Sequence, residues 1–312
     1  MQKKPRKLHG GDIYRHPDVI DFSVNTNPLG TPESVKRAVQ ESVAKIEHYP
    51  DVRCEALREA ISRFEQVNME EILCGNGAAE LFFAAVQAVW PQKALVIAPS
   101  FSEYEEALRS VGAEVEYYYL CEEDNFQIRE DYVDKLSEEI DMIFLCNPNN
   151  PTGQTIDRDM LIKILDRCKK QNIVVILDEC FLEFLDEPNR YEMSDLRGEY
   201  PNLLIIKAFT KIFSMPGLRL GYAISSNQDI LEEMSWKLQQ WNVSVPAQMA
   251  GVAALEKPKE YIRQTREYVS GQREYMRNIM KMMGYVVFAS KPIICFSKED
   301  QDLKKRHWKQ DF

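Results

Sequence analysis

Lys211 is the residue whose surroundings in the sequence point most directly to chemistry. It lies in the apolar stretch Phe209-Thr210-Lys211-Ile212-Phe213, and Arg219 follows eight positions later. Desolvation lowers the pKa of a lysine, and a neutral amine is a nucleophile that can form a Schiff base. An arginine can hold a phosphate through two parallel hydrogen bonds. Because most lysines lie at the surface, the pair becomes informative only together with its neighbours.

Polar residues also follow two other short apolar runs. Asp178 ends the run Ile173–Asp178. A carboxylate there is costly to bury unless it meets hydrogen-bond donors or a cation such as a pyridinium ring, and a helix N-cap is the alternative. The segment Asn147–Gly153 contains two Asn-Pro steps and a glycine. Such a rigid turn can aim a hydrogen-bond donor at a ligand, or it can be purely structural.

A glycine-rich stretch and an aromatic residue complete this set. Gly75 and Gly77 lie where an apolar run is followed by a helical pattern, and free N–H groups at a helix N-terminus favour a phosphate. Glu80 stands where a dinucleotide-binding loop has its third glycine, which disfavours a nucleotide-binding α/β protein. Phe101, after the next run, could stack on a flat ligand or pack against its own helix.

The elements that must position these residues alternate between strands and helices. Short apolar runs predict strands buried on both faces, at Ile72–Gly75, Ala94–Ala98, Val115–Leu120, Met142–Cys146, Ile173–Asp178, Leu203–Lys207 and Leu220–Ile224. Helical patterns lie between most of them, for example at Ala78–Trp90, Ser102–Val111 and Arg158–Lys170. This alternation predicts a mostly parallel seven-stranded sheet between helices, with ligands beyond the carboxyl ends of the strands.

The pattern changes near Gln228, where long helical segments begin. Pro258–Met283 is rich in i,i+4 charge pairs, and Tyr285–Ala289 resembles one more strand. We therefore predict a large domain over 49–227 and a smaller C-terminal domain over 228–312. Residues 1–48 are expected to form an N-terminal arm and part of the small domain.

Composition excludes several function classes. The net charge of −10 disfavours a nucleic-acid partner, and no apolar run reaches the ~18 residues that a membrane span needs. The cysteines number seven and include no CxxC pair, so we expect neither a disulfide framework nor a metal site. This cysteine usage suggests a reducing cytoplasm.

Taken in order, the stretches GNGAAE, NPNNPTG, DE after an apolar strand and TKxxxxPGLRLGY resemble the class I/II aminotransferase family of fold-type I enzymes. The resemblance covers roughly residues 9 to 290. It implies pyridoxal 5'-phosphate (PLP) as the cofactor and a small-molecule amino-acid substrate. It also implies an α/β fold with a seven-stranded sheet sandwiched by helices and a smaller α+β domain.

The resemblance also implies a role for each matching position. Lys211 would carry PLP and move protons, and Asp178 would keep the pyridine nitrogen protonated. Phe101 would stack on the ring, and Asn150 would bond its phenolic oxygen. The expected phosphate ligands are Thr210, Arg219 and the backbone of Gly77, Ala78 and Ala79. Tyr49 would reach the phosphate of a neighbouring subunit, which implies a homodimer with shared active sites.

Within the family, the opening resembles threonine-phosphate decarboxylases of cobalamin synthesis. The similarity lies in His9-Gly10-Gly11 and in the segment Asp21–Gly30. It implies substrate contacts from His9, Asn27 and Asn150. Histidinol-phosphate aminotransferases are close relatives, and both groups act on a phosphorylated amine. The sequence leaves open whether a proton or CO2 leaves the substrate.

Three departures from the family pattern bear on activity. Phe181 stands where relatives often have a tyrosine, and Ala208 where they often have a phosphate-binding serine or threonine. After Lys291 the chain continues through the apolar stretch Pro292–Phe296 into the charged segment Ser297–Phe312. No arginine in that segment lies in the motif expected to hold a substrate carboxylate, and Arg306 is not a convincing substitute. We therefore expect a truncated or frameshifted small domain. A PLP-binding remnant with impaired catalysis is the alternative that follows.

Overall fold

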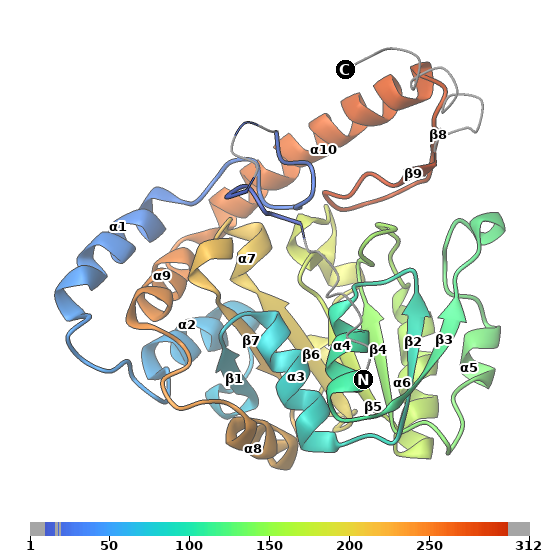
Figure 1. Ribbon diagram of the computed structural model, residues 1–312, viewed down its shortest axis with the longest axis horizontal. Coiled ribbons are helices and arrows are strands. Elements are labelled where there is room, and N and C mark those ends of the chain that lie inside the picture. The colour runs from blue at the N-terminus through green and yellow to red at the C-terminus, as the bar shows by residue number, and fades with distance from the viewer. Residues whose placement is uncertain (1–9, 16–17, 19, 299–312) are drawn as a thin grey trace.

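A seven-stranded mixed sheet forms the centre of the molecule, which the computed structural model describes over residues 10–15, 18 and 20–298 (Figure 1). Its strands are β1 (Ile72–Gly75), β2 (Lys93–Ala98), β3 (Glu114–Tyr119), β4 (Met142–Cys146), β5 (Val174–Asp178), β6 (Leu203–Ala208) and β7 (Gly221–Ile224). They lie in the order β1-β7-β6-β5-β4-β2-β3. Only β7 runs antiparallel to its neighbours, β1 and β6. The sheet therefore agrees with the predicted fold class.

Helices cover both faces of this sheet. They are α1 (Glu33–Ser42), α2 (Glu55–Glu65), α3 (Ala78–Val89), α4 (Glu103–Ser110), α5 (Asp131–Asp134), α6 (Arg158–Gln171), α7 (Phe209–Ile212), α8 (Gln228–Lys237), α9 (Val245–Leu255) and α10 (Pro258–Met282). Strand side chains alternate between the two faces. Ile176 and Leu204 pack with α3, α4 and α8, whereas Val175 and Leu203 pack with α2 and α6. Both faces are buried, which explains why the strands are apolar throughout.

The predicted strand boundaries agree with the observed ones to within one residue for the seven strands of the sheet. The strand predicted over Tyr285–Ala289 is shorter in the structure. Only β8 (Val286–Val287) forms there, and it pairs antiparallel with β9 (Ser297–Lys298). No helix among the described residues is long and apolar enough to cross a membrane.

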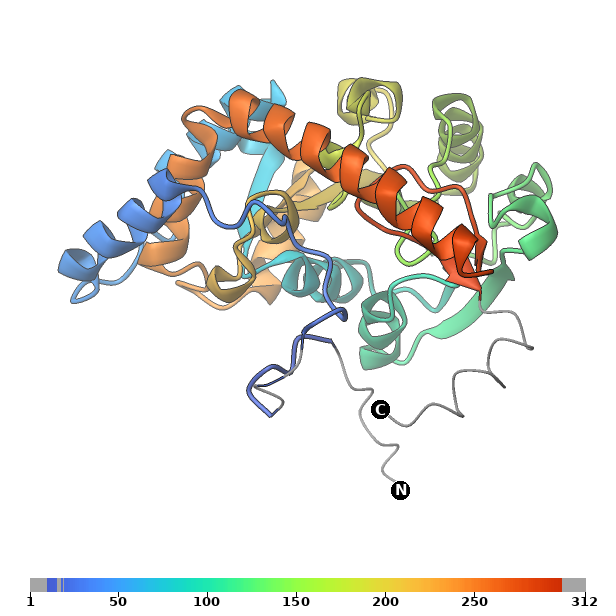
Figure 2. The ribbon, with the colours of Figure 1, turned by 90° about the horizontal axis from the view of Figure 1, so that it is seen from above.

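Helix α10 and the carboxyl ends of the parallel strands lie on the same side of the molecule. The arrows of β2, β3 and β4 point toward this side in Figure 1, and Figure 2 shows α10 crossing over it. Helix α1 lies beside α9 in both views and packs against it. The N-terminal segment therefore contacts the C-terminal helices, whereas the predicted domain boundaries at residues 48 and 227 remain predictions.

Candidate active site

A cavity at the carboxyl ends of β4, β5 and β6 brings together most of the residues singled out from the sequence. Its lining consists of Ala78, Ala79, Phe82, Phe101, Cys146, Asn150, Asp178, Cys180, Phe181, Ala208, Thr210, Lys211 and Arg219. The strands deliver these residues to one place because parallel strands end at the same edge of a sheet. Each of four separate sequence stretches therefore contributes to one site.

Lys211 lies on the short helix α7, directly after β6. Its amine is 5.5 Å from the centre of the Phe181 ring. Burial lowers the pKa of Lys211, and the nearby Arg219 cation acts in the same direction, while Cys180 and Asp178 oppose the shift. A larger fraction of the amine is therefore neutral, which is the form that attacks a carbonyl carbon.

Asp178 ends β5, and only 5% of its surface is exposed. Its carboxylate accepts hydrogen bonds from the Tyr104 hydroxyl at 2.5 Å and from the Cys180 backbone N–H at 2.9 Å. Burial raises the pKa of Asp178, and these hydrogen bonds together with the Lys211 charge offset that effect only in part. A cationic group placed next to this carboxylate would stabilise its ionised form.

Gly77 and Arg219 together shape one end of the cavity. Gly77 precedes α3 with φ of +88°, and a Cβ added there would lie 2.7 Å from Nη2 of Arg219. The guanidinium therefore occupies space that any other residue at 77 would fill. The free N–H groups at the start of α3 face the same end, next to Ala78 and Ala79. This combination of a cation and backbone donors suits a phosphate.

Three described residues predicted from the sequence do not line the cavity: Gly77, which lies against Arg219, and Asn27 and Tyr49. The Asn27 side chain donates 2.7 Å hydrogen bonds to the Ile212 carbonyl and to Thr265 Oγ1, and it accepts one from the Leu29 N–H. Its backbone N–H also bonds the Lys211 carbonyl, so Asn27 ties the N-terminal segment to α7 and α10. Tyr49 is 78% exposed. His9 lies outside the described residues.

Tyr104 is a site residue that the sequence reasoning missed. It lies on α4, is fully buried, and packs its ring against Phe144 with centroids 4.9 Å apart. Its position three residues after Phe101 was visible, but no local pattern shows that its hydroxyl reaches Asp178. Cys146 and Cys180 also line the cavity, and neither was assigned to the site from the sequence.

A cluster of buried charged side chains, which was not predicted from the sequence, lies on the face of the sheet that α2 covers. Lys207 is 3% exposed, although its sequence run was interpreted as an apolar strand. Its Nζ lies near four carboxylates, at 2.8 Å from Glu65, 3.3 Å from Glu183, 3.5 Å from Glu192 and 3.7 Å from Glu179. Neither oxygen of Glu179 has a hydrogen-bond partner among the described residues, and burial raises its pKa well above the ordinary value.

Comparison with known proteins shows the family. The model of aminotransferase class I and II matches residues 17–310. The chain is 38% identical over 256 residues to threonine-phosphate decarboxylase of Salmonella typhimurium, covering 80% of this chain and 70% of that protein. It is 34% identical over 310 residues to histidinol-phosphate aminotransferase of Desulfitobacterium hafniense, covering 97% and 84%.

A solved structure supports the same assignment. The histidinol-phosphate aminotransferase from Clostridium acetobutylicum superposes with a TM-score of 0.82 at 29% identity, covering 92% of this chain and 88% of that one. The sheet, the cavity at its carboxyl edge and the ordered motifs agree with this likeness. The chain therefore belongs to the class I and II aminotransferase family, and it is a PLP-dependent enzyme.

Proposed function

We propose that this cavity holds PLP through Lys211 and that the enzyme decarboxylates a phosphorylated amino acid of the threonine-phosphate type. The observation that carries the proposal is the convergence of Lys211, Asp178 and Arg219 on one cavity. When bound, PLP draws electrons from the substrate α-carbon, so that a bond to that carbon can break. The residues of the chain supply binding, orientation and proton transfer.

The shape and the charges of the cavity fit PLP. Arg219, Thr210 and the start of α3 would hold its phosphate, in the space that only a glycine at position 77 leaves free. Asp178 would pair with the ring nitrogen, and that cation would stabilise the ionised form of a carboxylate whose pKa burial raises. Phe101 would lie against the ring, and Asn150 would donate to the ring oxygen.

Lys211 would serve both as the attachment point and as the proton carrier. Burial lowers its pKa, which makes the amine easier to deprotonate and therefore better suited to accept and release a proton. Phe181 stands next to this amine and has no hydroxyl to donate toward the cofactor. We therefore expect the oxygen of the bound ring to be more basic than it would be beside a tyrosine.

The substrate assignment rests on the relatives. The relative from Salmonella typhimurium is named threonine-phosphate decarboxylase. The relative from Caldanaerobacter subterraneus, which is 39% identical over 280 residues, is named putative threonine-phosphate decarboxylase. A histidinol-phosphate-type aminotransferase is the second candidate, because that relative covers more of the chain. The two reactions differ in whether CO2 or a proton leaves the α-carbon.

Spectroscopy and product analysis test the proposal. The purified protein with PLP should show a visible absorption band, and borohydride should fix the cofactor to the peptide that contains Lys211. Lys211→Ala should lose both. Threonine phosphate should then release CO2, whereas histidinol phosphate with an oxo-acid acceptor should not exchange its amino group. A wild-type protein without the band would overturn the cofactor site, and a band without turnover would indicate a PLP-binding remnant.

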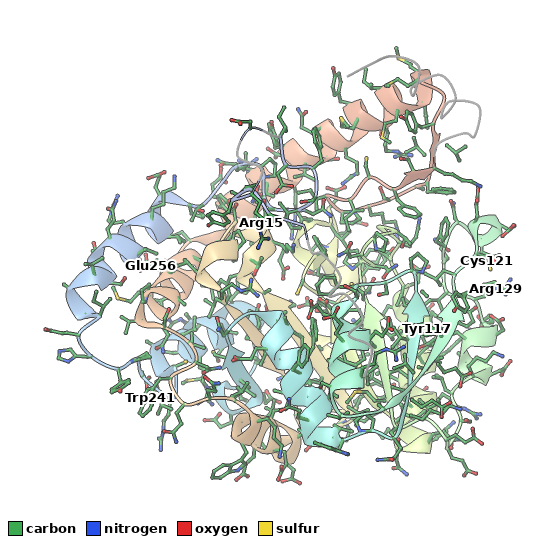
Figure 3. The ribbon with its side chains drawn as sticks, viewed as in Figure 1. Arg15, Tyr117, Cys121, Arg129, Trp241 and Glu256 are labelled. Atoms are coloured by element: carbon green, nitrogen blue, oxygen red, sulfur yellow. The ribbon has the colours of Figure 1, made fainter. Side chains whose placement is uncertain are left out.

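We further propose that two copies of the chain form a homodimer with shared sites. The N-terminal part of the chain exposes many apolar side chains, namely Ile13, Tyr14, Ile20, Phe22, Val24, Leu29, Val43, Ile46, Tyr49 and Val52. Tyr49 stacks on Trp241 with ring centroids 4.4 Å apart. Trp241, which is labelled in Figure 3, lies on the loop between α8 and α9. A second copy would cover this apolar surface.

Mixing two variants tests whether sites are shared. Lys211→Ala and Tyr49→Ala should each be nearly inactive as homodimers. After the subunits are mixed and exchanged, about one quarter of the sites should regain both residues, and activity should return to that extent. A monomer in light scattering, or exchanged heterodimers without recovered activity, would contradict the proposal.

A further inference from the structure

A second cavity, of about 590 Å³, lies between α10 and the segment that follows β5. It shares no lining residue with the proposed PLP site. Four cationic side chains line it, from Arg190, Arg273, Arg277 and Lys291. Arg273 and Arg277 are one helical turn apart, so the same face of α10 presents both. Four cations around one cavity stand out in a chain whose net charge is −10.

Three of these cations, Arg190, Arg273 and Lys291, have no carboxylate within ion-pair distance among the residues that the structure describes. The Arg273 guanidinium donates instead to the Pro292 carbonyl at 3.0 Å and to Ser270 Oγ at 3.4 Å. The Lys291 ammonium contacts the Tyr191 hydroxyl and lies 4.7 Å from the centre of that ring. Burial lowers the pKa of Arg273, so its charge lacks part of the stabilisation that water would provide.

The acidic residues of the lining lie nearer to solvent than Arg273 and Arg277, which are partly buried, whereas Arg190 and Lys291 are exposed. Asp186, Glu187 and Glu274 are all exposed. Glu274 and Arg277 form an ion pair of 3.4 Å, but the Glu274 side chain is 61% exposed and that of Arg277 only 24%. The deeper part of the cavity is therefore more positive than its margin.

Two buried polar atoms of the lining have no hydrogen-bond partner in the described structure. They are Oγ of Ser290, a residue that is 6% exposed, and Nε of Arg277. Buried polar atoms are nearly always satisfied, so a donor pair of this kind indicates a missing acceptor. Both atoms are hydrogen-bond donors, and both residues line this cavity.

We propose that this cavity binds a tetrahedral oxyanion of the phosphate class. Arg273, Arg277 and Lys291 would supply positive charge, and Ser290 Oγ would add a neutral donor. Charge-assisted hydrogen bonds from guanidinium groups to phosphate are among the strongest in proteins. The anion would join α10 to the segment after β5, in addition to the hydrogen bond that Arg266 of α10 donates to the Glu183 carbonyl.

The proposed anion site also touches the loop of the cofactor cavity. The Lys291 N–H donates to the Gly153 carbonyl at 3.2 Å, and a Cβ at Gly153 would lie 2.6 Å from Cβ of Ser290. Gly153 ends the turn-rich loop that carries Asn150. An anion bound by Ser290 and Lys291 would therefore hold a segment that packs directly on this loop.

Calorimetric titration of the PLP-loaded protein with inorganic phosphate tests the proposal. Bound PLP fills its own phosphate site, so that site does not compete. Arg277→Gln and Lys291→Gln should each weaken phosphate binding about tenfold, and Ser290→Ala about threefold. Arg263→Gln is the matched control, because Arg263 lies on the same helix, pairs with Glu260 and Glu267, and does not line the cavity.

The outcomes are distinct. Weaker binding in the cavity variants with unchanged binding in Arg263→Gln supports the proposal. No measurable phosphate binding by the wild type, or equal binding by the wild type and both charge variants, overturns it. An equal loss in Arg263→Gln overturns it as well, since general electrostatics would then explain the effect. Lys291 is exposed, so its variant is expected to fold even if Arg277→Gln does not.

Discussion

Replacing Tyr104 by phenylalanine removes one hydroxyl from the proposed PLP site and nothing else. The Tyr104 ring is fully buried and packs against Phe82 and Phe144, contacts that phenylalanine preserves. The lost hydrogen bond is the 2.5 Å contact with Asp178. We therefore expect a folded protein in which the carboxylate accepts one hydrogen bond fewer.

The size of the effect follows from the role of that hydrogen bond. A hydrogen bond to a charged group contributes about 1.5–3 kcal/mol. Because the Cys180 N–H still donates to Asp178, we take the lower end of this range. The hydrogen bond from Tyr104 lowers the pKa of Asp178, so its loss favours the neutral carboxyl, which cannot pair with a cationic ring. PLP affinity should fall about tenfold.

The assay is a titration of the apoprotein with PLP, followed by visible absorbance. Tyr132→Phe is a matched control, because Tyr132 is also fully buried but its hydroxyl has no partner among the described residues. That variant should bind PLP like the wild type. If Tyr104→Phe also binds PLP like the wild type, or if both variants lose affinity equally, the role assigned to the Tyr104–Asp178 contact is wrong.

Two further predictions concern the phosphate end of the cavity and the buried charges on the other face. Gly77→Ala should weaken PLP binding at least tenfold, since its Cβ would displace Arg219. Gly112→Ala is the control, because Gly112 has φ of +82° and no atom within 4 Å of an added Cβ, so the substitution should cost only backbone strain of about 1–2 kcal/mol in stability. Equal affinities of the two variants for PLP would argue against the clash. The raised pKa of Glu179 means that the folded chain keeps a proton that the unfolded chain releases, so the free energy of unfolding falls as pH rises above the ordinary carboxyl pKa. Glu179→Gln should flatten this fall in denaturant unfolding above the ordinary carboxyl pKa, by about 1.4 kcal/mol per pH unit wherever folded Glu179 keeps its proton, and an unchanged slope would show that Glu179 is ionised throughout.

Much of the site could be predicted because it depends on strand ends. Asp178 and Lys211 come at or just after the end of a short apolar run, and the topology of a parallel sheet places such residues at one edge. Arg219 precedes β7 and reaches the same edge because β7 runs antiparallel to β6, a direction that only the structure shows. The same reasoning located Gly77 at the start of a helix. No knowledge of side-chain packing was needed, since the backbone alone brings these positions together.

The residues that could not be predicted depend on contacts between elements far apart in the chain. Glu65 and Lys207 are 142 positions apart, and the apolar neighbours of Lys207 indicate a strand without indicating its partners. Asn27 resembled a substrate ligand, yet its amide is occupied by Ile212 and Thr265. Hydrogen-bond partners of this kind are set by which helices pack on which strands.

The sequence by itself therefore determined the fold class, the family and the residues that meet at the carboxyl edge of the sheet. These follow from local hydrophobic patterns and from motifs that each lie next to one of the predicted strands along the chain. The tertiary structure alone decided which side chains satisfy Asp178, how Asn27 is used, and that cations gather between α10 and the segment after β5. Such contacts depend on side-chain packing across elements, which no local pattern encodes.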